Sequence, residues 1–152
     1  MGMLMQVAGW HRAGVLALTW CLICGQALAG AELAVVASRP TLWSLERVLV
    51  RLTPDGDVRR LTVVEPDRIM IISGLSAGSL IFDGRVNGAG YAGTAYFYAP
   101  ECGRIGYPAI AEIAADGGRL VISGRAPVRH PRTCAITGAR TERIELELFY
   151  MK

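Results

Sequence analysis

The chain has 152 residues, of which 52% are hydrophobic, and it carries a formal net charge of +3 at pH 7. This length is enough for one domain with a proper core and, once an amino-terminal leader is set aside, too short for two. A charge of this size is too small to predict a nucleic-acid partner.

Residues 1–31 have the pattern of a secretory signal peptide. Arg12 precedes an apolar run over residues 13–24, and residues 27–29 place small side chains where a signal peptidase cleaves. The run is shorter than the roughly 20 residues that a membrane-spanning helix needs, so an uncleaved anchor is the less favoured alternative. We therefore expect an exported protein, periplasmic or secreted, with no membrane span after cleavage and a single β domain over residues 32–152.

From residue 33 onward, apolar residues recur with a period of two, and turn-forming residues separate the runs. Asp55-Gly56, Asn87-Gly88 and Asp116-Gly117 predict three hairpin turns, because these residue types tolerate positive φ. The predicted strands are 47–53, 58–65, 69–72, 80–86, 91–98, 105–113, 119–123 and 143–150. The pattern predicts an all-β fold, an antiparallel sandwich or small barrel of seven to nine short strands.

Three segments have features of their own. Ile69-Met70-Ile71-Ile72 is a continuous apolar run, which is typical of a strand covered on both faces. Residues 42–52 could form a helix, but Arg47 stands where a capping box has glutamate or glutamine, and the β-branched content favours a strand. In the last predicted strand, alternate residues starting at Ile144 should face the core.

Two cysteines remain after removal of the leader, because Cys21 and Cys24 lie within it. An even pair in an exported domain predicts a disulfide between Cys102 and Cys134. His130 is the only histidine left, and one imidazole without a free thiolate is a poor donor set for zinc or copper. We therefore expect no metal site and no cofactor, with His130 exposed in a loop.

Two patterns in the chain are associated with catalysis. Gly74-Leu75-Ser76-Ala77-Gly78 matches the G-x-S-x-G nucleophile elbow, which needs a strand before it and a helix after it. A predicted strand precedes this segment, but another strand follows it, so a turn is expected. A carboxylate-based hydrolase remains an alternative, since two acids at the right separation suffice for glycoside hydrolysis. The candidate acids are Asp83, Glu101, Glu112, Glu145 and Glu147.

Arginines are concentrated toward the carboxyl terminus. The cluster consists of Arg119, Arg125, Arg129, Arg132, Arg140 and Arg143. Pro127 and Pro131 should hold the segment between them extended, and the disulfide should bring the cluster together as one positive surface. Such a surface predicts an anionic partner, such as a polysaccharide, a lipid headgroup or an acidic protein face. A solvated arginine-rich surface without a partner is the simpler explanation and the favoured one.

Four tyrosines surround a glycine-rich stretch over residues 88–106. They are Tyr91, Tyr96, Tyr98 and Tyr107. In a strand, Tyr96 and Tyr98 lie on one face and Phe97 on the other, so one of these faces must belong to the core. Core packing is the favoured explanation for the tyrosines, and a half-exposed aromatic surface for ligand recognition is the alternative.

Residues 80–149 resemble a known type of domain. The resemblance lies in Gly84-Arg85-Val86-Asn87-Gly88, Tyr91-Ala92-Gly93-Thr94-Ala95, Cys102-Gly103, Tyr107, Gly124-Arg125-Ala126-Pro127, Cys134 and Gly138. These residues are similar to those of a small β domain of uncharacterised exported proteins in alphaproteobacteria, which also occurs appended to secreted caspase-like proteins. The resemblance implies an accessory or interaction domain with a disulfide and no assigned activity.

Together these observations predict an exported, non-enzymatic binding or accessory β module of unknown ligand. Its partner would be an anionic envelope polymer or an envelope protein, with no nucleic acid involved. An inhibitor or protein partner of a cell-envelope hydrolase is the alternative from a different class, because a small disulfide-bonded barrel offers a rigid blocking surface.

Overall fold

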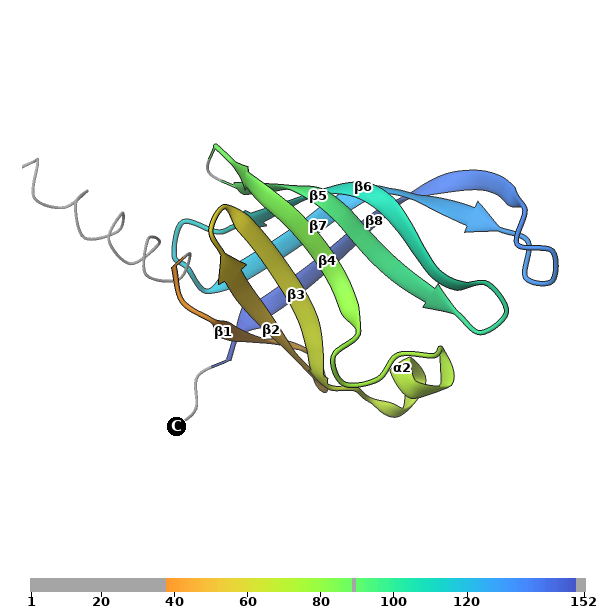
Figure 1. Cartoon of the computed structure of the whole chain (residues 1–152), viewed down its shortest axis with the longest axis horizontal. Coiled ribbons are helices and arrows are strands. Elements are labelled where there is room, and N and C mark those ends of the chain that lie inside the picture. Colours follow the sequence, from red (N-terminus) through yellow and green to blue (C-terminus); the bar gives the residue numbers. More distant parts are fainter. Residues whose placement is uncertain (1–37, 89, 150–152) are drawn as a thin grey trace, which may run out of the picture.

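The computed structural model describes residues 38–88 and 90–149, which form a closed barrel of eight antiparallel strands (Figure 1). The predicted signal peptide lies outside the described residues. The strands are β1 (Thr41–Leu45), β2 (Val48–Asp55), β3 (Val58–Glu65), β4 (Leu80–Asn87), β5 (Gly90–Ala99), β6 (Gly103–Ile113), β7 (Arg119–Arg129) and β8 (Ile136–Leu148). The predicted all-β antiparallel fold with one disulfide is confirmed, and it takes the form of a barrel rather than a sandwich.

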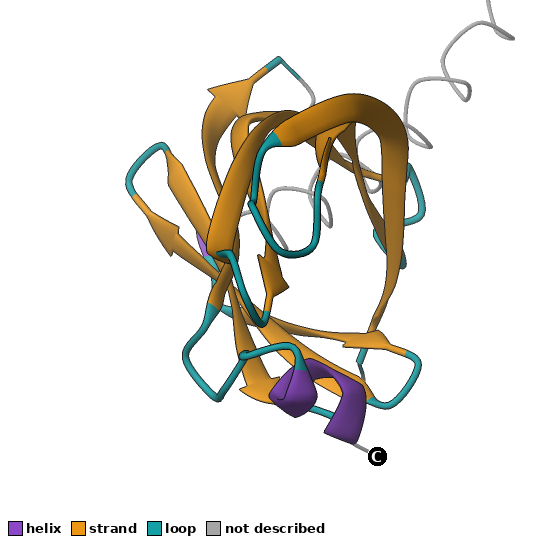
Figure 2. Cartoon of the chain, turned by 90° about the vertical axis from the view of Figure 1, so that its right-hand side faces the viewer, coloured by secondary structure: helices purple, strands orange, loops and turns teal. Residues whose placement is uncertain are grey.

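Each strand pairs with the next along the chain, and β1 closes the barrel by pairing with β8 through Trp43 and Leu148. One end of the barrel carries the β1–β2, β5–β6 and β7–β8 turns together with the helix α2 (Arg68–Ile72). We call this the disulfide end, and Figure 2 looks onto it. The predicted hairpin turns between β2 and β3, β4 and β5, and β6 and β7 all lie at the opposite end, as Figure 1 shows.

The barrel interior is filled by side chains. Alternate residues of every strand point inward, as the period of two predicts, and the last strand follows this pattern with Leu146 fully buried and Glu145 and Glu147 exposed. The largest fully buried side chains are Trp43, Phe82, Leu52, Leu61, Leu120, Ile122 and Leu146. An eight-stranded barrel is just narrow enough for side chains to fill it. Any ligand is therefore expected at a rim rather than along the axis.

The prediction of a buried strand at residues 69–72 was wrong, because these residues form α2. The Asp67 side chain caps this helix by accepting a hydrogen bond from the Met70 amide at 2.7 Å. Met70 packs against the core, whereas the other three apolar residues of the run are exposed. A helix therefore precedes the G-x-S-x-G segment and strand β4 follows it, the reverse of the order that a nucleophile elbow needs.

The segment that could have formed a helix, residues 42–52, is the β1–β2 hairpin instead. Its turn contains Glu46, which adopts a φ of 53°, unusual for a residue other than glycine. Within the part of the chain that is described, no helix has the length and apolar character needed to cross a membrane.

Candidate functional site

A cavity of about 450 Å³ opens at the disulfide end, between the β5–β6 and β7–β8 hairpins. Its volume lies in the range of small-molecule sites. The lining is mostly apolar, with three charged residues among it. The lining residues are Phe97, Ala99, Pro100, Glu101, Cys102, Ile105, Pro127, Val128, Arg129, Pro131 and Arg140. The Phe97 ring is in contact with that of Tyr107, with ring centroids 6.1 Å apart, so the cavity rests directly on the core.

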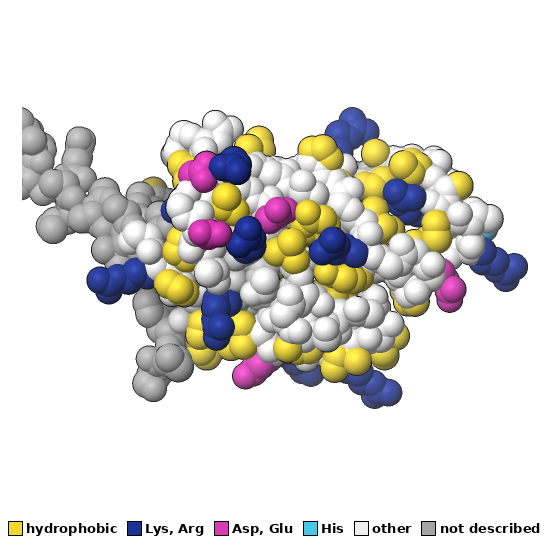
Figure 3. Space-filling view, viewed as in Figure 1, with side chains coloured by type: hydrophobic (Ala, Val, Ile, Leu, Met, Phe, Trp, Pro, Cys, Tyr) yellow, Lys and Arg dark blue, Asp and Glu magenta, His cyan; other side chains and the backbone are white. Residues whose placement is uncertain are grey.

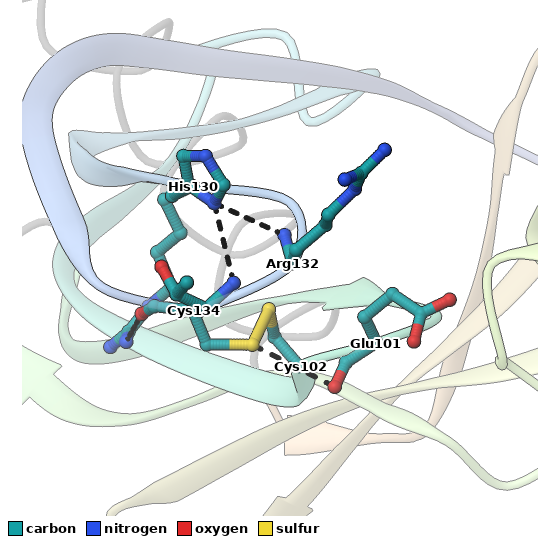
Figure 4. Close-up of a disulfide and its surroundings, with 7 residues drawn as sticks. Glu101, Cys102, His130, Arg132 and Cys134 are labelled. Carbon is teal, nitrogen blue, oxygen red and sulfur yellow. Dashed lines mark hydrogen bonds between the residues drawn. A yellow bond between two sulfur atoms is a disulfide. The ribbon is translucent and has the colours of Figure 1, made fainter.

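The predicted disulfide is confirmed and lies beside this cavity. It joins Cys102 in the β5–β6 turn to Cys134 in the β7–β8 loop, with the Cα atoms 5.6 Å apart. The Cys134 sulfur lies 3.7 Å from the Glu101 carbonyl oxygen (Figure 4), a packing contact because a disulfide sulfur carries no hydrogen to donate. A disulfide of this kind is typical of proteins in oxidising compartments.

His130 organises the loop that carries Cys134. Its Nδ1 accepts hydrogen bonds from the backbone amides of Arg132 and Thr133, each at 3.3 Å, and the imidazole is exposed (Figure 4). Its carbonyl oxygen accepts a hydrogen bond from the Cys134 amide at 2.9 Å. Cys134 itself has a φ of 58°. The histidine thus serves the loop conformation, as the prediction of an exposed loop residue allows.

The structure divides the six clustered arginines among three places. Arg129 and Arg140 line the cavity, and the Arg132 side chain extends from the same loop away from the disulfide (Figure 4). Arg125 lies on the outer face of β7, while Arg119 and Arg143 line a polar groove beside β1. Dark-blue side chains are accordingly dispersed in Figure 3 rather than gathered in one patch. Only the set at the disulfide end lies near the cysteines.

Arg129 and Arg140 differ in how their charges are satisfied. The Arg129 Nη1 donates to the Cys134 carbonyl oxygen at 2.6 Å, whereas its Nε is buried without a hydrogen-bond partner. No carboxylate among the described residues forms an ion pair with Arg129. Arg140 donates from Nε to Glu142 at 2.9 Å. A buried donor without a partner is costly, so the Arg129 guanidinium has an unused capacity for an acceptor.

The four tyrosines do not form one surface. Tyr91 and Tyr107 are buried in the interior, in agreement with the core explanation. Tyr96 and Tyr98 are half-buried and alternate with Phe97 along β5. Their hydroxyls donate to the Asp83 carboxylate at 2.8 Å and to the Leu80 carbonyl oxygen at 3.1 Å.

One buried cation was not anticipated from the sequence. Arg59 on β3 is only 6% exposed, and its guanidinium lies 5.6 Å from the centroid of the Tyr91 ring. Its Nη1 donates to the carbonyl oxygens of Gly56 and Val58, so it closes the β2–β3 turn from the inside. Its position follows from strand alternation, in which residue 59 shares the inward face with Leu61.

The structure places the candidate acids in different surroundings: Asp83 accepts a hydrogen bond from the Tyr96 hydroxyl, and Glu101 lines the cavity at the disulfide end. Glu145 and Glu147 share the outer groove with Arg119 and Arg143. The hydrogen bond from Arg143 holds the pKa of Glu145 below its ordinary value, whereas a general acid needs a raised pKa. The described residues also include no group of three or more metal-ligating side chains placed to share an ion.

The raised pKa of Tyr107 predicts that the protein loses stability at high pH. Burial raises its pKa above the ordinary value of 10.0, with Glu142 raising it further and Arg140 opposing this. Above pH 10 the unfolded chain releases the phenolic proton while the folded protein retains it, so the free energy of unfolding falls as pH rises; below pH 10 this contribution is fully present. The pKa of Tyr96 is also raised, by burial and by Asp83, and this adds to the loss of stability. Urea unfolding at pH 8 and pH 11 should show the decline, and an equal decline in a Tyr96→Phe/Tyr107→Phe double variant would contradict this explanation.

The resemblance of residues 80–149 to an exported β domain stays a prediction. No protein-family model, no curated protein and no solved structure matches the chain.

Proposed function

We propose that this protein is an exported, non-enzymatic binding module that holds an anionic group of its partner at the disulfide end. An acidic envelope polymer or an acidic envelope protein is the class of partner that this charge would recognise. The disulfide supports export, because such bonds persist in oxidising compartments.

The observation that carries the proposal is Arg129. Arg129 lines an apolar cavity, its Nε is buried without a hydrogen-bond partner, and it forms no ion pair with the described carboxylates. A cation beside apolar walls interacts with an anion more strongly than one surrounded by water. Arg140 on the facing strand β8 adds a second positive charge to the same cavity. An arginine that served only solubility would need neither burial nor a cavity.

Binding to a soluble polyanion such as dextran sulfate tests the proposal. Arg129→Gln should weaken binding roughly 10- to 100-fold, because a hydrogen bond to a charged group contributes about 1.5–3 kcal/mol. Binding by the wild type should weaken steeply between 0.1 and 1 M salt, since the Debye length shrinks from about 10 Å to about 3 Å. Isothermal titration calorimetry provides the affinities.

Arg125→Gln is the matched control, because Arg125 carries the same charge on the outer face of β7. It should change the affinity less than about threefold, as expected for an exposed charge. Near-UV circular dichroism verifies that the Arg129 variant keeps its fold, since that side chain also holds the Cys134 carbonyl oxygen. Equal losses in the two variants would show diffuse surface attraction and overturn the proposal.

A further inference from the structure

We infer that the cavity at the disulfide end binds a single-chain amphiphile, an alkyl chain that ends in one negatively charged head group. This inference rests on the proposed anion site and goes beyond the polymer or protein partner to a small ligand that the same site would hold. The shared chemistry of the ligand is the apolar chain with one anionic head, whether that head is a carboxylate or a phosphate.

The apolar walls of the cavity require the alkyl chain. Phe97, Ile105 and Val128 form much of the lining, with Pro127 and Pro131 on the side of the β7–β8 hairpin. Val128 is 40% exposed although it follows the inward face of β7, so its side chain faces the cavity without a covering layer. Water next to these walls is released when an alkyl chain replaces it. A small inorganic anion would leave the walls wet.

The filled interior limits where the chain can lie. Phe82, Leu61 and the other core side chains occupy the barrel axis, so the alkyl chain must lie across the mouth, above the Phe97 and Tyr107 rings. The disulfide joins the two hairpins that form the walls, so the cavity exists before binding. Preorganisation of this kind lowers the entropic cost of binding.

The charges at the mouth favour a single negative charge on the head group. Among the charged residues that line the cavity, Arg129 and Arg140 are positive and Glu101 is negative, which leaves one positive charge in excess. Glu142 already holds Arg140, so an incoming anion must compete with this carboxylate. Arg129, which has no such competitor, is the first contact for the head group.

Calorimetric titration of the oxidised protein with decanoate, butyrate, decanol and decyltrimethylammonium tests this inference. Decanoate should bind at least about tenfold more tightly than butyrate, because each buried methylene strengthens binding roughly fourfold. It should also bind at least about tenfold more tightly than decanol, which has the chain but no charge. The cationic amphiphile should bind no better than decanol. Comparison of decanoate with decyl phosphate distinguishes a carboxylate source from a phosphate source.

Two pairs of variants locate the ligand. Glu142→Gln should strengthen decanoate binding by about threefold or more, since it frees Arg140, whereas Glu145→Gln breaks the equivalent pair with Arg143 on the outer face and should change nothing. Val128→Glu should weaken decanoate binding by about tenfold or more. Val86→Glu is its control, because Val86 is similarly exposed, at 49%, but lies at the opposite end of the barrel.

The outcomes separate this inference from the proposed function. If butyrate and decanoate bind equally tightly and Arg129→Gln weakens the binding of both, the anion site is supported. The inference that the ligand carries an alkyl chain is then wrong. If decanol binds as well as decanoate, the charged head group contributes nothing and the inference is wrong, whereas the anion site is still decided by dextran sulfate binding and its dependence on Arg129. Equal effects of Val128→Glu and Val86→Glu would also overturn the inference, since the chain would not lie in this cavity.

Discussion

Replacing Cys102 and Cys134 together with serine should lower the free energy of unfolding by about 3.7 kcal/mol. The two residues are 32 positions apart, so the bond closes a loop that contains all of β6 and β7. In the chain-entropy description, removing the bond restores the freedom of this loop to the unfolded chain and leaves the folded state unchanged. The loss would be a large share of the 5–15 kcal/mol that typical domains have.

Urea unfolding of the oxidised protein and of the double-serine variant measures this loss directly. The wild type treated with a reductant is a control and should match the variant within about 1 kcal/mol, because both lack the bond. A difference below about 1 kcal/mol between the oxidised protein and the variant would show that the bond constrains little. The variant should also bind decanoate more weakly, since the two hairpins that wall the cavity lose their covalent link.

The strands that alternate cleanly and the turns that carry glycine could be predicted from the sequence. The β2–β3, β4–β5 and β6–β7 hairpins are of this type. Strand β1 could not be separated from β2, because the turn between them contains Glu46 at positive φ and no glycine, proline or asparagine to mark it. The run 69–72 has no period at all, so a capped helical turn and a buried strand look alike in sequence. Strand β8 begins at Ile136, seven residues before its predicted start, because its first part is exposed and lacks apolar alternation.

The closure of the barrel and the cavity depend on contacts that no local pattern records. Pairing of Trp43 with Leu148 joins residues far apart in the chain, so a sandwich and a barrel were equally consistent with the strands. The cysteine pairing could be predicted because only one pairing was available. The positions of some arginines could be predicted, because strand alternation alone puts Arg140 and Arg143 on opposite faces of β8. The meeting of Arg129 and Arg140 in one cavity follows from the curvature of two hairpins, which the residue types do not encode locally.

A single added methyl group at Gly93 should destabilise the barrel by about 3 kcal/mol or more, or prevent folding. Gly93 pairs with Gly84 across the β4–β5 hairpin, and the two backbones approach closely there. A Cβ at position 93 would overlap with the carbonyl oxygen of Asp83 and the Cα of Gly84, which are backbone atoms that cannot rotate away. Overpacking in a rigid position costs about 1–3 kcal/mol, and a clash with backbone belongs at the upper end of that range or beyond.

Gly138→Ala is the matched control for Gly93→Ala. Gly138 also lies in a strand, but a Cβ there would meet no atom within 4 Å. Its replacement should change stability by no more than about 0.5 kcal/mol, as is usual for exposed positions. Urea unfolding followed by far-UV circular dichroism gives both values from the same measurement. If Gly93→Ala is as stable as Gly138→Ala, the close approach of β4 and β5 at this point is wrong, and with it the curvature that brings β8 round to β1.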